Sequence, residues 1–187
     1  MRLYTTIISI TLLAVGCSRK IDMEQISLED PDGHAVQLSL PAEGQFDVYV
    51  FLSPECPLCQ NYSRNFEEIQ TVYLDQGVRI IGVFPGVEYP LEDIMQYRDD
   101  YEMSIPFLLD PEFVLTNALA AEITPEAVLV DNQGRIRYQG GIDDWAVTVR
   151  KHRQVITYNY LTDAIDACLA GEEVEVKKTE AVGCFIQ

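Results

Sequence analysis

Apolar residues between positions 26 and 171 fall into runs and stripes that predict alternating strands and helices. Positions 46–52 and 78–84 are apolar almost throughout, which is typical of strands buried on both faces of a sheet. Two further short strands are predicted at residues 26–38, around the turn Pro31-Asp32-Gly33. Weaker strand patterns are found at 106–109, 127–130 and 135–138.

Helical periodicity is clearest at residues 57–76. The apolar side chains of this segment recur every three or four residues, and Gly77 supplies a C-terminal stop. The stripe consists of Leu58, Tyr62, Phe66, Ile69 and Tyr73. Further helices are predicted at 91–101, 112–121 and 158–170.

The order of these elements predicts the fold class. A helix joins the two buried strands, so these strands are expected to pair in parallel. The hairpin at 127–138 adds antiparallel strands. We therefore predict an α/β fold in three layers, with a mixed central sheet, helices on both faces and an N-terminal β-hairpin.

Residues 1–16 read as a signal peptide. Arg2 is their only charge, and the apolar run at 5–15 is too short to span a bilayer comfortably. The run ends in Ala-Val-Gly-Cys17, which resembles the lipobox of bacterial lipoproteins, although Leu13 lies four residues before the cysteine and not the usual three. The resemblance implies cleavage before Cys17 and lipidation of that residue. The alternative is an ordinary secretory signal with an incidental cysteine.

Either interpretation places the mature protein outside the cytoplasm, where disulfides persist. Ser18 follows the cysteine, and the lack of Asp at this position favours the periplasmic face of the outer membrane. Residues 17–25 are expected to form a tether.

The charge balance narrows the possible partners. Thirteen Lys and Arg residues against thirty Asp and Glu residues give a net charge of −17 over 187 residues. Nucleic acid is excluded as a partner because phosphate binding needs a basic surface. Attachment to anionic lipid by charge is excluded for the same reason, whereas a lipid on Cys17 would provide a membrane anchor without basic residues.

The chemistry is expected at Cys56-Pro57-Leu58-Cys59, where a buried strand meets a helix. Cys56 would cap the helix, beside unsatisfied N–H groups and the positive end of the helix dipole, which favour a thiolate. Pro57 fits the first turn of the helix, where its missing N–H costs nothing. Cys59 lies close enough to close a small disulfide ring. Cys56 could therefore attack a disulfide and Cys59 could resolve the product.

With this motif, residues 26–171 resemble the thioredoxin superfamily, and within it the secreted redoxin-domain proteins. Thr124-Pro125-Glu-Ala-Val-Leu-Val-Asp131 matches the segment in which that family has a cis-proline before a strand. The resemblance implies a thioredoxin-like fold with Pro125 cis and facing the two cysteines. It also implies that the backbone of Thr124 pairs with an extended substrate.

Paired cysteines have three other common uses. A structural disulfide would add little stability across so short a loop. A zinc site lacks ligands, because the only histidines, His34 and His152, are remote in sequence. A copper-handling role would usually need a histidine near the thiols, and we keep it as a non-enzymatic alternative. The main prediction is a site without a metal or a cofactor.

A peroxiredoxin-like peroxidase is a further alternative. Of that family's two marker positions before the attacking cysteine, Ser53 matches one, but Tyr49 replaces the expected proline. Thioredoxins also carry a buried Asp six residues before the first cysteine, where this chain has Val50. Glu55 is the nearest carboxylate and would disfavour a Cys56 thiolate, so the sequence does not predict the redox potential.

Two cysteines remain. Cys168 lies on the apolar stripe of the last predicted helix and is expected to be buried. Cys184 belongs to a tail at 172–187, whose Thr-x-Ala-x-Gly-Cys pattern resembles the end of a subgroup of redoxin-domain proteins. Cys184 could fold back onto Cys56 as a third redox thiol, pair with Cys168, or lie in a tail that packs through Phe185.

The cluster Arg150-Lys151-His152-Arg153 is the only dense basic segment. We interpret it as a solvated loop, with a docking patch for an acidic partner as the alternative.

These observations predict an extracytoplasmic, lipid-anchored thiol–disulfide oxidoreductase. Cys56 attacks, Cys59 resolves, and Thr124 with Pro125 shapes the substrate groove. The expected partners are protein thiols or disulfides and an unidentified protein that recycles the pair.

Overall fold

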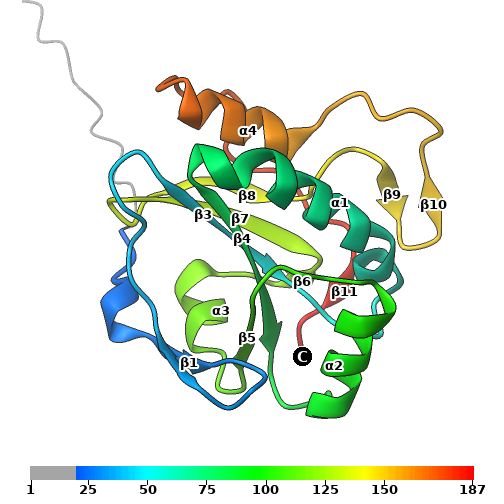
Figure 1. Cartoon of the computed structure of the whole chain (residues 1–187). Coiled ribbons are helices and arrows are strands. Elements are labelled where there is room, and N and C mark those ends of the chain that lie inside the picture. The colour runs from blue at the N-terminus through cyan, green and yellow to red at the C-terminus, as the bar shows by residue number, and fades with distance from the viewer. Residues whose placement is uncertain (1–19) are drawn as a thin grey trace, which may run out of the picture.

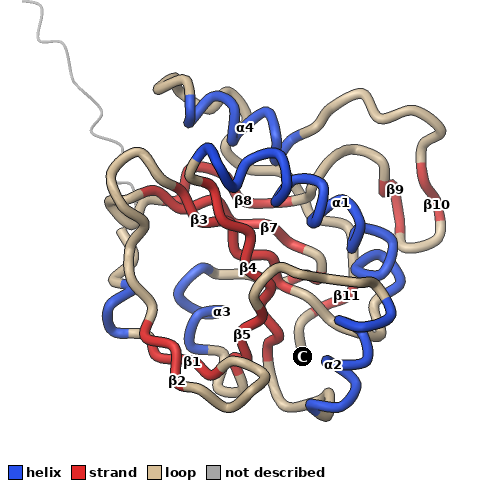
Figure 2. Tube along the Cα trace, in the orientation of Figure 1, coloured by secondary structure: helices blue, strands red, loops and turns tan. Residues whose placement is uncertain are grey.

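The computed structural model describes residues 20–187, and the predicted signal peptide and Cys17 lie outside this range. Its centre is a seven-stranded sheet with the order β2-β1-β5-β4-β3-β7-β8 (Figures 1 and 2). These strands are β1 (Ser27–Glu29), β2 (Ala35–Gln37), β3 (Phe46–Phe51), β4 (Val78–Pro85), β5 (Phe107–Asp110), β7 (Glu126–Asp131) and β8 (Ile136–Gly140).

The sheet is mixed, as predicted. Strands β3, β4 and β5 run parallel, whereas β7 pairs antiparallel with β3. The N-terminal hairpin of β1 and β2 joins the sheet through β5. Every residue of β3 and β7 is buried, which explains why both strands are mostly apolar.

Helices cover both faces of the sheet, which confirms the three layers. Side chains of α1 (Pro57–Tyr73), α2 (Leu91–Asp100) and α4 (Tyr160–Leu169) share one hydrophobic core with Val48 and Val50 of β3. The intervening residues of β3 face a second core on the opposite side of the sheet, which is covered by α3 (Val114–Leu119). Figure 1 shows α1 and α4 above the sheet and α3 below it.

Several elements differ in length from the prediction. Helix α1 ends at Tyr73 and continues as the 3-10 turn η2 (Leu74–Gln76), after which Gly77 turns the chain with a φ of 88°. The predicted helix at 112–121 is shortened to α3, because Phe113 and Ala120 on either side of it have left-handed backbone conformations.

The end of the predicted tether packs against the domain. Residues 23–25 form the 3-10 turn η1 (Met23–Gln25), and the side chains of Ile21 and Met23 are buried in the second core. The Ile21 N–H donates to the Gly134 carbonyl at 2.9 Å. Among residues 20–187, no helix has the length and apolar composition that a membrane span requires.

Two small sheets were not predicted. A hairpin of β9 (Ala146–Thr148) and β10 (Lys151–His152) projects beside α1. A second pair is formed by β6 (Ile123–Thr124) and β11 (Cys184–Phe185), so the predicted tail returns to the body of the molecule.

Candidate active site

The two cysteines lie where β3 ends and α1 begins. Cys56 is the N-cap of α1 and Pro57 occupies the first helical position, as predicted. The Cys56 N–H donates to the Ser53 carbonyl at 3.2 Å, which fixes the turn between the strand and the helix. Both cysteines are buried, with only 1% of Cys56 exposed.

The predicted substrate-binding residues lie against Cys56. The peptide bond between Thr124 and Pro125 is cis, which confirms that prediction. Strand β7, which follows Pro125, pairs with β3 so that Glu126 lies opposite Phe51, and this register brings the two loops together. In its thiol form, Cys56 donates from Sγ to the Thr124 carbonyl at 3.1 Å.

The surroundings of Cys56 favour its thiolate. Its pKa is lowered from an ordinary value of 9.0 to about 5, first because the Cys59 thiol donates a hydrogen bond to it. The Cys184 thiol and the N–H groups of Cys59 and Leu58 add to this effect, and burial opposes it. The two N–H groups belong to the first turn of α1, so the predicted position at the helix N-terminus contributes to the low pKa, after the larger effect of Cys59.

Cys59 has the opposite character. Burial raises its pKa well above the ordinary value, and the neighbouring Cys56 raises it further. Its Sγ accepts a hydrogen bond from the Ser53 N–H at 3.5 Å. Its carbonyl accepts hydrogen bonds from the Ser63 hydroxyl at 2.9 Å and the Tyr97 hydroxyl at 3.1 Å, so the first turn of α1 is tied to α2. The site thus pairs a thiolate with a buried thiol.

The remaining cysteines are placed differently. Cys168 is buried on α4 and burial raises its pKa, which agrees with the predicted core position. Cys184 lies on β11, opposite Thr124, and its thiol contacts that of Cys56. The structure therefore brings Cys56, Cys59, Thr124 and Cys184 together.

A comparison with known protein families now identifies the chain. The model of the AhpC/TSA family matches residues 21–139, which include both cysteines and the cis-proline. The chain belongs to the AhpC/TSA family.

A curated relative adds a second comparison. The thiol-disulfide oxidoreductase ResA of Halalkalibacterium halodurans is 28% identical over 109 residues, which is 58% of this chain and 60% of the relative. The chain thus matches somewhat less than two thirds of that protein. This AhpC/TSA member is a homologue of a thiol–disulfide oxidoreductase.

Solved structures agree on the fold. An uncharacterised conserved protein from Geobacillus kaustophilus has a TM-score of 0.79 at 21% identity, covering 91% of this chain and 90% of its own. A hypothetical protein from Sinorhizobium meliloti has a TM-score of 0.76 at 25% identity, covering 96% of this chain and 95% of its own. A putative thiol:disulfide interchange protein DsbE from Chlorobium tepidum has a TM-score of 0.59 at 18% identity, covering 81% of this chain and 99% of its own. The fold is thioredoxin-like, as predicted.

Glu126 is a site residue that was not predicted from the sequence. Its buried carboxylate accepts hydrogen bonds from the N–H groups of Glu122 at 2.9 Å and Ile123 at 3.3 Å. It also accepts one from the Gln139 side chain at 2.9 Å. Glu126 thereby holds the strand that presents Thr124 to Cys56. A carboxylate at the start of a mostly apolar strand, next to the Thr-Pro motif, was the signal in the sequence.

A cavity adjoins the cis-proline. It has a volume of about 390 Å³ and is lined by Pro125, Tyr62 and Arg153, among others. Tyr62 donates to the Asp143 carboxylate at 2.5 Å across its wall.

The basic cluster is exposed to solvent, as predicted, and two of its residues form β10. The His152 ring stacks on Trp145 with ring centroids 4.3 Å apart. The Arg153 side chain donates to the Asp144 carbonyl at 2.9 Å and lies 3.3 Å from its carboxylate. Within residues 20–187, the side chains of Arg150 and Lys151 form no hydrogen bond or ion pair.

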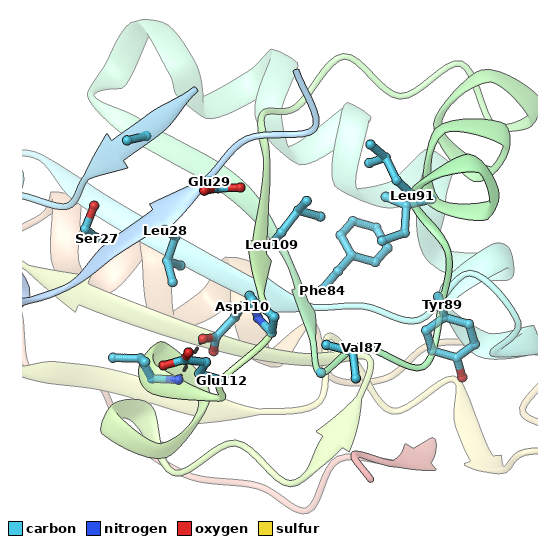
Figure 3. Close-up of a pocket in the computed structure, with 15 residues that line it drawn as sticks. Ser27, Leu28, Glu29, Phe84, Val87, Tyr89, Leu91, Leu109, Asp110 and Glu112 are labelled. Carbon is cyan, nitrogen blue, oxygen red and sulfur yellow. Dashed lines mark hydrogen bonds between the residues drawn. The ribbon is translucent and has the colours of Figure 1, made fainter. Parts of the chain in front are cut away.

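A second cavity lies away from the thiols. It has a volume of about 500 Å³ between β1, β5 and the start of α2, and none of the described cysteines lines it. Figure 3 shows Phe84 and Leu109 on its apolar side and Glu29 and Glu112 near its rim. Tyr89 lines this cavity and also a smaller one beside Thr124 and Cys184.

Proposed function

We propose that this chain is an extracytoplasmic thiol–disulfide oxidoreductase that exchanges disulfides with protein substrates through Cys56 and Cys59. The contact of Cys56, at the start of α1, with the backbone of Thr124 beside a cis-proline carries this proposal. Family membership and the similarity to ResA support the same chemistry.

The two thiols divide the reaction between them. The Cys56 thiolate attacks one sulfur of a substrate disulfide, forms a mixed disulfide and releases the other sulfur as a thiolate. Cys59 then attacks the Cys56 sulfur, the Cys56–Cys59 bond forms, and the rest of the substrate leaves. The Cys59 proton passes to the departing thiolate. The same steps in reverse oxidise a substrate dithiol, and a recycling partner sets the direction.

The backbone of Thr124 positions the substrate. A peptide that extends along β6 would place its own cysteine beside Cys56, because Thr124 is the residue that contacts the Cys56 sulfur. The exposed cavity at Pro125 leaves room for the substrate's neighbouring side chains.

Trapping of the mixed disulfide tests this function. In a Cys59→Ser/Cys184→Ser variant, no second thiol lies beside Cys56, so adducts with cellular proteins should accumulate. The matched control carries Cys56→Ser in addition and should form none. If no adduct forms under conditions in which a thioredoxin trapping variant yields one, the proposal is wrong.

Two further assays separate the alternatives. Rapid hydroperoxide consumption that is lost in Cys56→Ser, without insulin reduction, would replace the proposal with a peroxidase in which Cys56 becomes a sulfenic acid. Stoichiometric Cu(I) binding by the reduced protein, again without insulin reduction, would indicate a copper-handling protein. The oxidoreductase is expected to reduce insulin in the presence of dithiothreitol.

The location is proposed from the N-terminal sequence. Cleavage before Cys17 and lipidation of that residue would hold the domain at the periplasmic face of the outer membrane. The full chain should then partition with membranes, and Cys17→Ser should remove the lipid and prevent this. Equal membrane association of both forms would contradict a lipid anchor on Cys17.

A further inference from the structure

The segment 182–187 lies on the edge of the molecule where the proposed substrate would bind. We propose that Cys184 is a third redox thiol, carried on a strand that takes the place of the substrate and able to form an internal disulfide with Cys56. This inference rests on the proposed function, because it assigns an internal partner to the same exchange chemistry.

The first argument is the pairing of β11 with β6. Cys184 lies opposite Thr124 and Phe185 opposite Ile123, in antiparallel register. The Ile186 N–H donates to the Glu122 carbonyl at 3.0 Å, which extends the pairing by one residue. A substrate strand needs the same backbone groups, so the segment and the substrate exclude each other.

The second argument is the position of the Cys184 thiol. The register places Cys184 directly across from the residue whose carbonyl contacts the Cys56 sulfur, which is where a substrate cysteine would lie. Burial raises the pKa of Cys184 to about 11, and the adjacent Cys56 contributes. At neutral pH Cys184 is therefore a thiol that donates a hydrogen bond to the Cys56 thiolate.

The third argument is that the path of the tail is built into the fold. The Gln139 N–H donates to the Lys177 carbonyl at 3.0 Å, and the Thr179 N–H donates to the Gln139 carbonyl at 3.1 Å. The Thr179 hydroxyl also lies 2.6 Å from that of Tyr138. The tail is thus fastened to β8 before it reaches the redox site.

Gly183 completes this path. A Cβ atom at this position would overlap the Thr124 carbonyl, so the residue before Cys184 has to be glycine for the strand to dock. Phe185 is 75% exposed, whereas Ile186 packs against the second core. The close fit is therefore made by the backbone and Cys184, not by the aromatic side chain.

The chemical step is an exchange that needs no added oxidant. In the oxidised protein, Cys184 attacks the Cys56 sulfur, a Cys56–Cys184 bond forms, and the Cys56–Cys59 bond breaks. Cys59 leaves as a thiolate and takes up the proton that Cys184 loses, since burial raises its pKa. Attack by Cys59 on Cys56 reverses the step and frees the tail.

The internal disulfide is tested by mapping it in a Cys59→Ser variant treated with oxidised glutathione. Trypsin separates the relevant thiols, because Cys56 lies in peptide 21–64, Cys168 in 154–177 and Cys184 in 179–187. Glutathione first forms a mixed disulfide with Cys56, and Cys184 is expected to displace it. Most of the protein should then yield peptide 21–64 linked to 179–187.

Two control variants sharpen the result. Cys59→Ser/Cys168→Ser should give the same linked pair, whereas Cys59→Ser/Cys184→Ser should retain glutathione on Cys56. If Cys59→Ser keeps glutathione on Cys56 while Cys184 stays free, the inference is wrong, even where trapping of protein partners succeeds. Linked peptides without any trapped protein would instead refute the proposed function and leave the internal exchange standing.

A variant that keeps all cysteines tests whether the tail competes with the substrate for β6. Gly183→Val should prevent docking of the tail and raise kcat/KM for insulin reduction by about tenfold, if the tail is docked in about nine molecules of ten. Val176→Thr, at an exposed site earlier in the tail, is the matched control and should leave the rate unchanged. A rate that is equal in Gly183→Val and the wild type would show that the tail does not compete with the substrate.

Discussion

The pH dependence of Cys56 reactivity is the sharpest test of the site. Its pKa of about 5, against an ordinary 9.0, means that half of this thiol is ionised near pH 5. An ordinary thiol is then ionised to about 0.01%, so Cys56 carries roughly 5,000-fold more thiolate at that pH. The hydrogen bonds to Cys56 stabilise its thiolate, so the reactivity of Cys56 should be lost as the pH falls through 5.

Ionisation is only part of the rate. The intrinsic nucleophilicity of a thiolate falls with its pKa, by roughly 40- to 100-fold over four units at a Brønsted coefficient of about 0.4–0.5. Counted per accessible thiol, Cys56 should therefore react about 50- to 120-fold faster than an ordinary thiol at pH 5, but at a similar rate at pH 7. Burial of Cys56 lowers both rates by the same factor and leaves the shape of the pH profile unchanged. The low pKa gives a rate that barely changes between pH 6 and 8.

Alkylation by iodoacetamide measures this profile. The reduced protein is sampled between pH 4 and 9, and alkylated Cys56 is quantified in its tryptic peptide, with Cys168 in a separate peptide as a buried control. We expect a midpoint near pH 5 followed by a plateau. A rate that instead climbs by about tenfold per unit from pH 5 to 8 would belong to an ordinary thiol and refute the assigned hydrogen bonds.

Three variants give further predictions. Cys184→Ala removes a hydrogen bond to the Cys56 thiolate and should move the alkylation midpoint above pH 5, whereas an unchanged midpoint would place the two thiols out of contact. Phe66→Ala leaves a cavity under α1 and should lower the free energy of unfolding by about 3–5 kcal/mol, measured in urea. Glu126→Gln removes the charge from a carboxylate with three donors and should cost about 1–3 kcal/mol, with faster amide exchange at residues 122–124; normal exchange there would contradict its positioning role.

Local sequence signals predicted the place of the paired cysteines in the fold. The position of Cys56 follows from a buried strand, a proline at the first helical position and a helical stripe, all within 30 residues. The cis peptide bond at Pro125 came from the family resemblance, and the pairing of β7 with β3 then brings it to Cys56. The absence of a carboxylate at Val50 was also visible in the sequence.

Long-range pairing accounts for what the sequence did not predict. Strands β6 and β11 have two residues each, so neither carries a periodic pattern, and their partners lie about 60 positions apart. The sequence left three possibilities for Cys184: contact with Cys56, a disulfide with Cys168, or a tail that packs through Phe185. Only the fold distinguishes among them. The role of Glu126 likewise depends on three donors that the fold brings to it.

The tail also couples substrate binding to the chemistry of Cys56. A hydrogen bond to a thiolate stabilises the reduced protein and makes the corresponding disulfide more oxidising. Cys184 supplies part of this stabilisation only while β11 is docked on Thr124. A substrate that displaces the strand therefore removes a donor from Cys56, raises the Cys56 pKa and strengthens its nucleophilicity when the target sulfur arrives. The resting enzyme would keep a stable thiolate shielded by its own chain, and the binding of an extended peptide would expose it in a more reactive form.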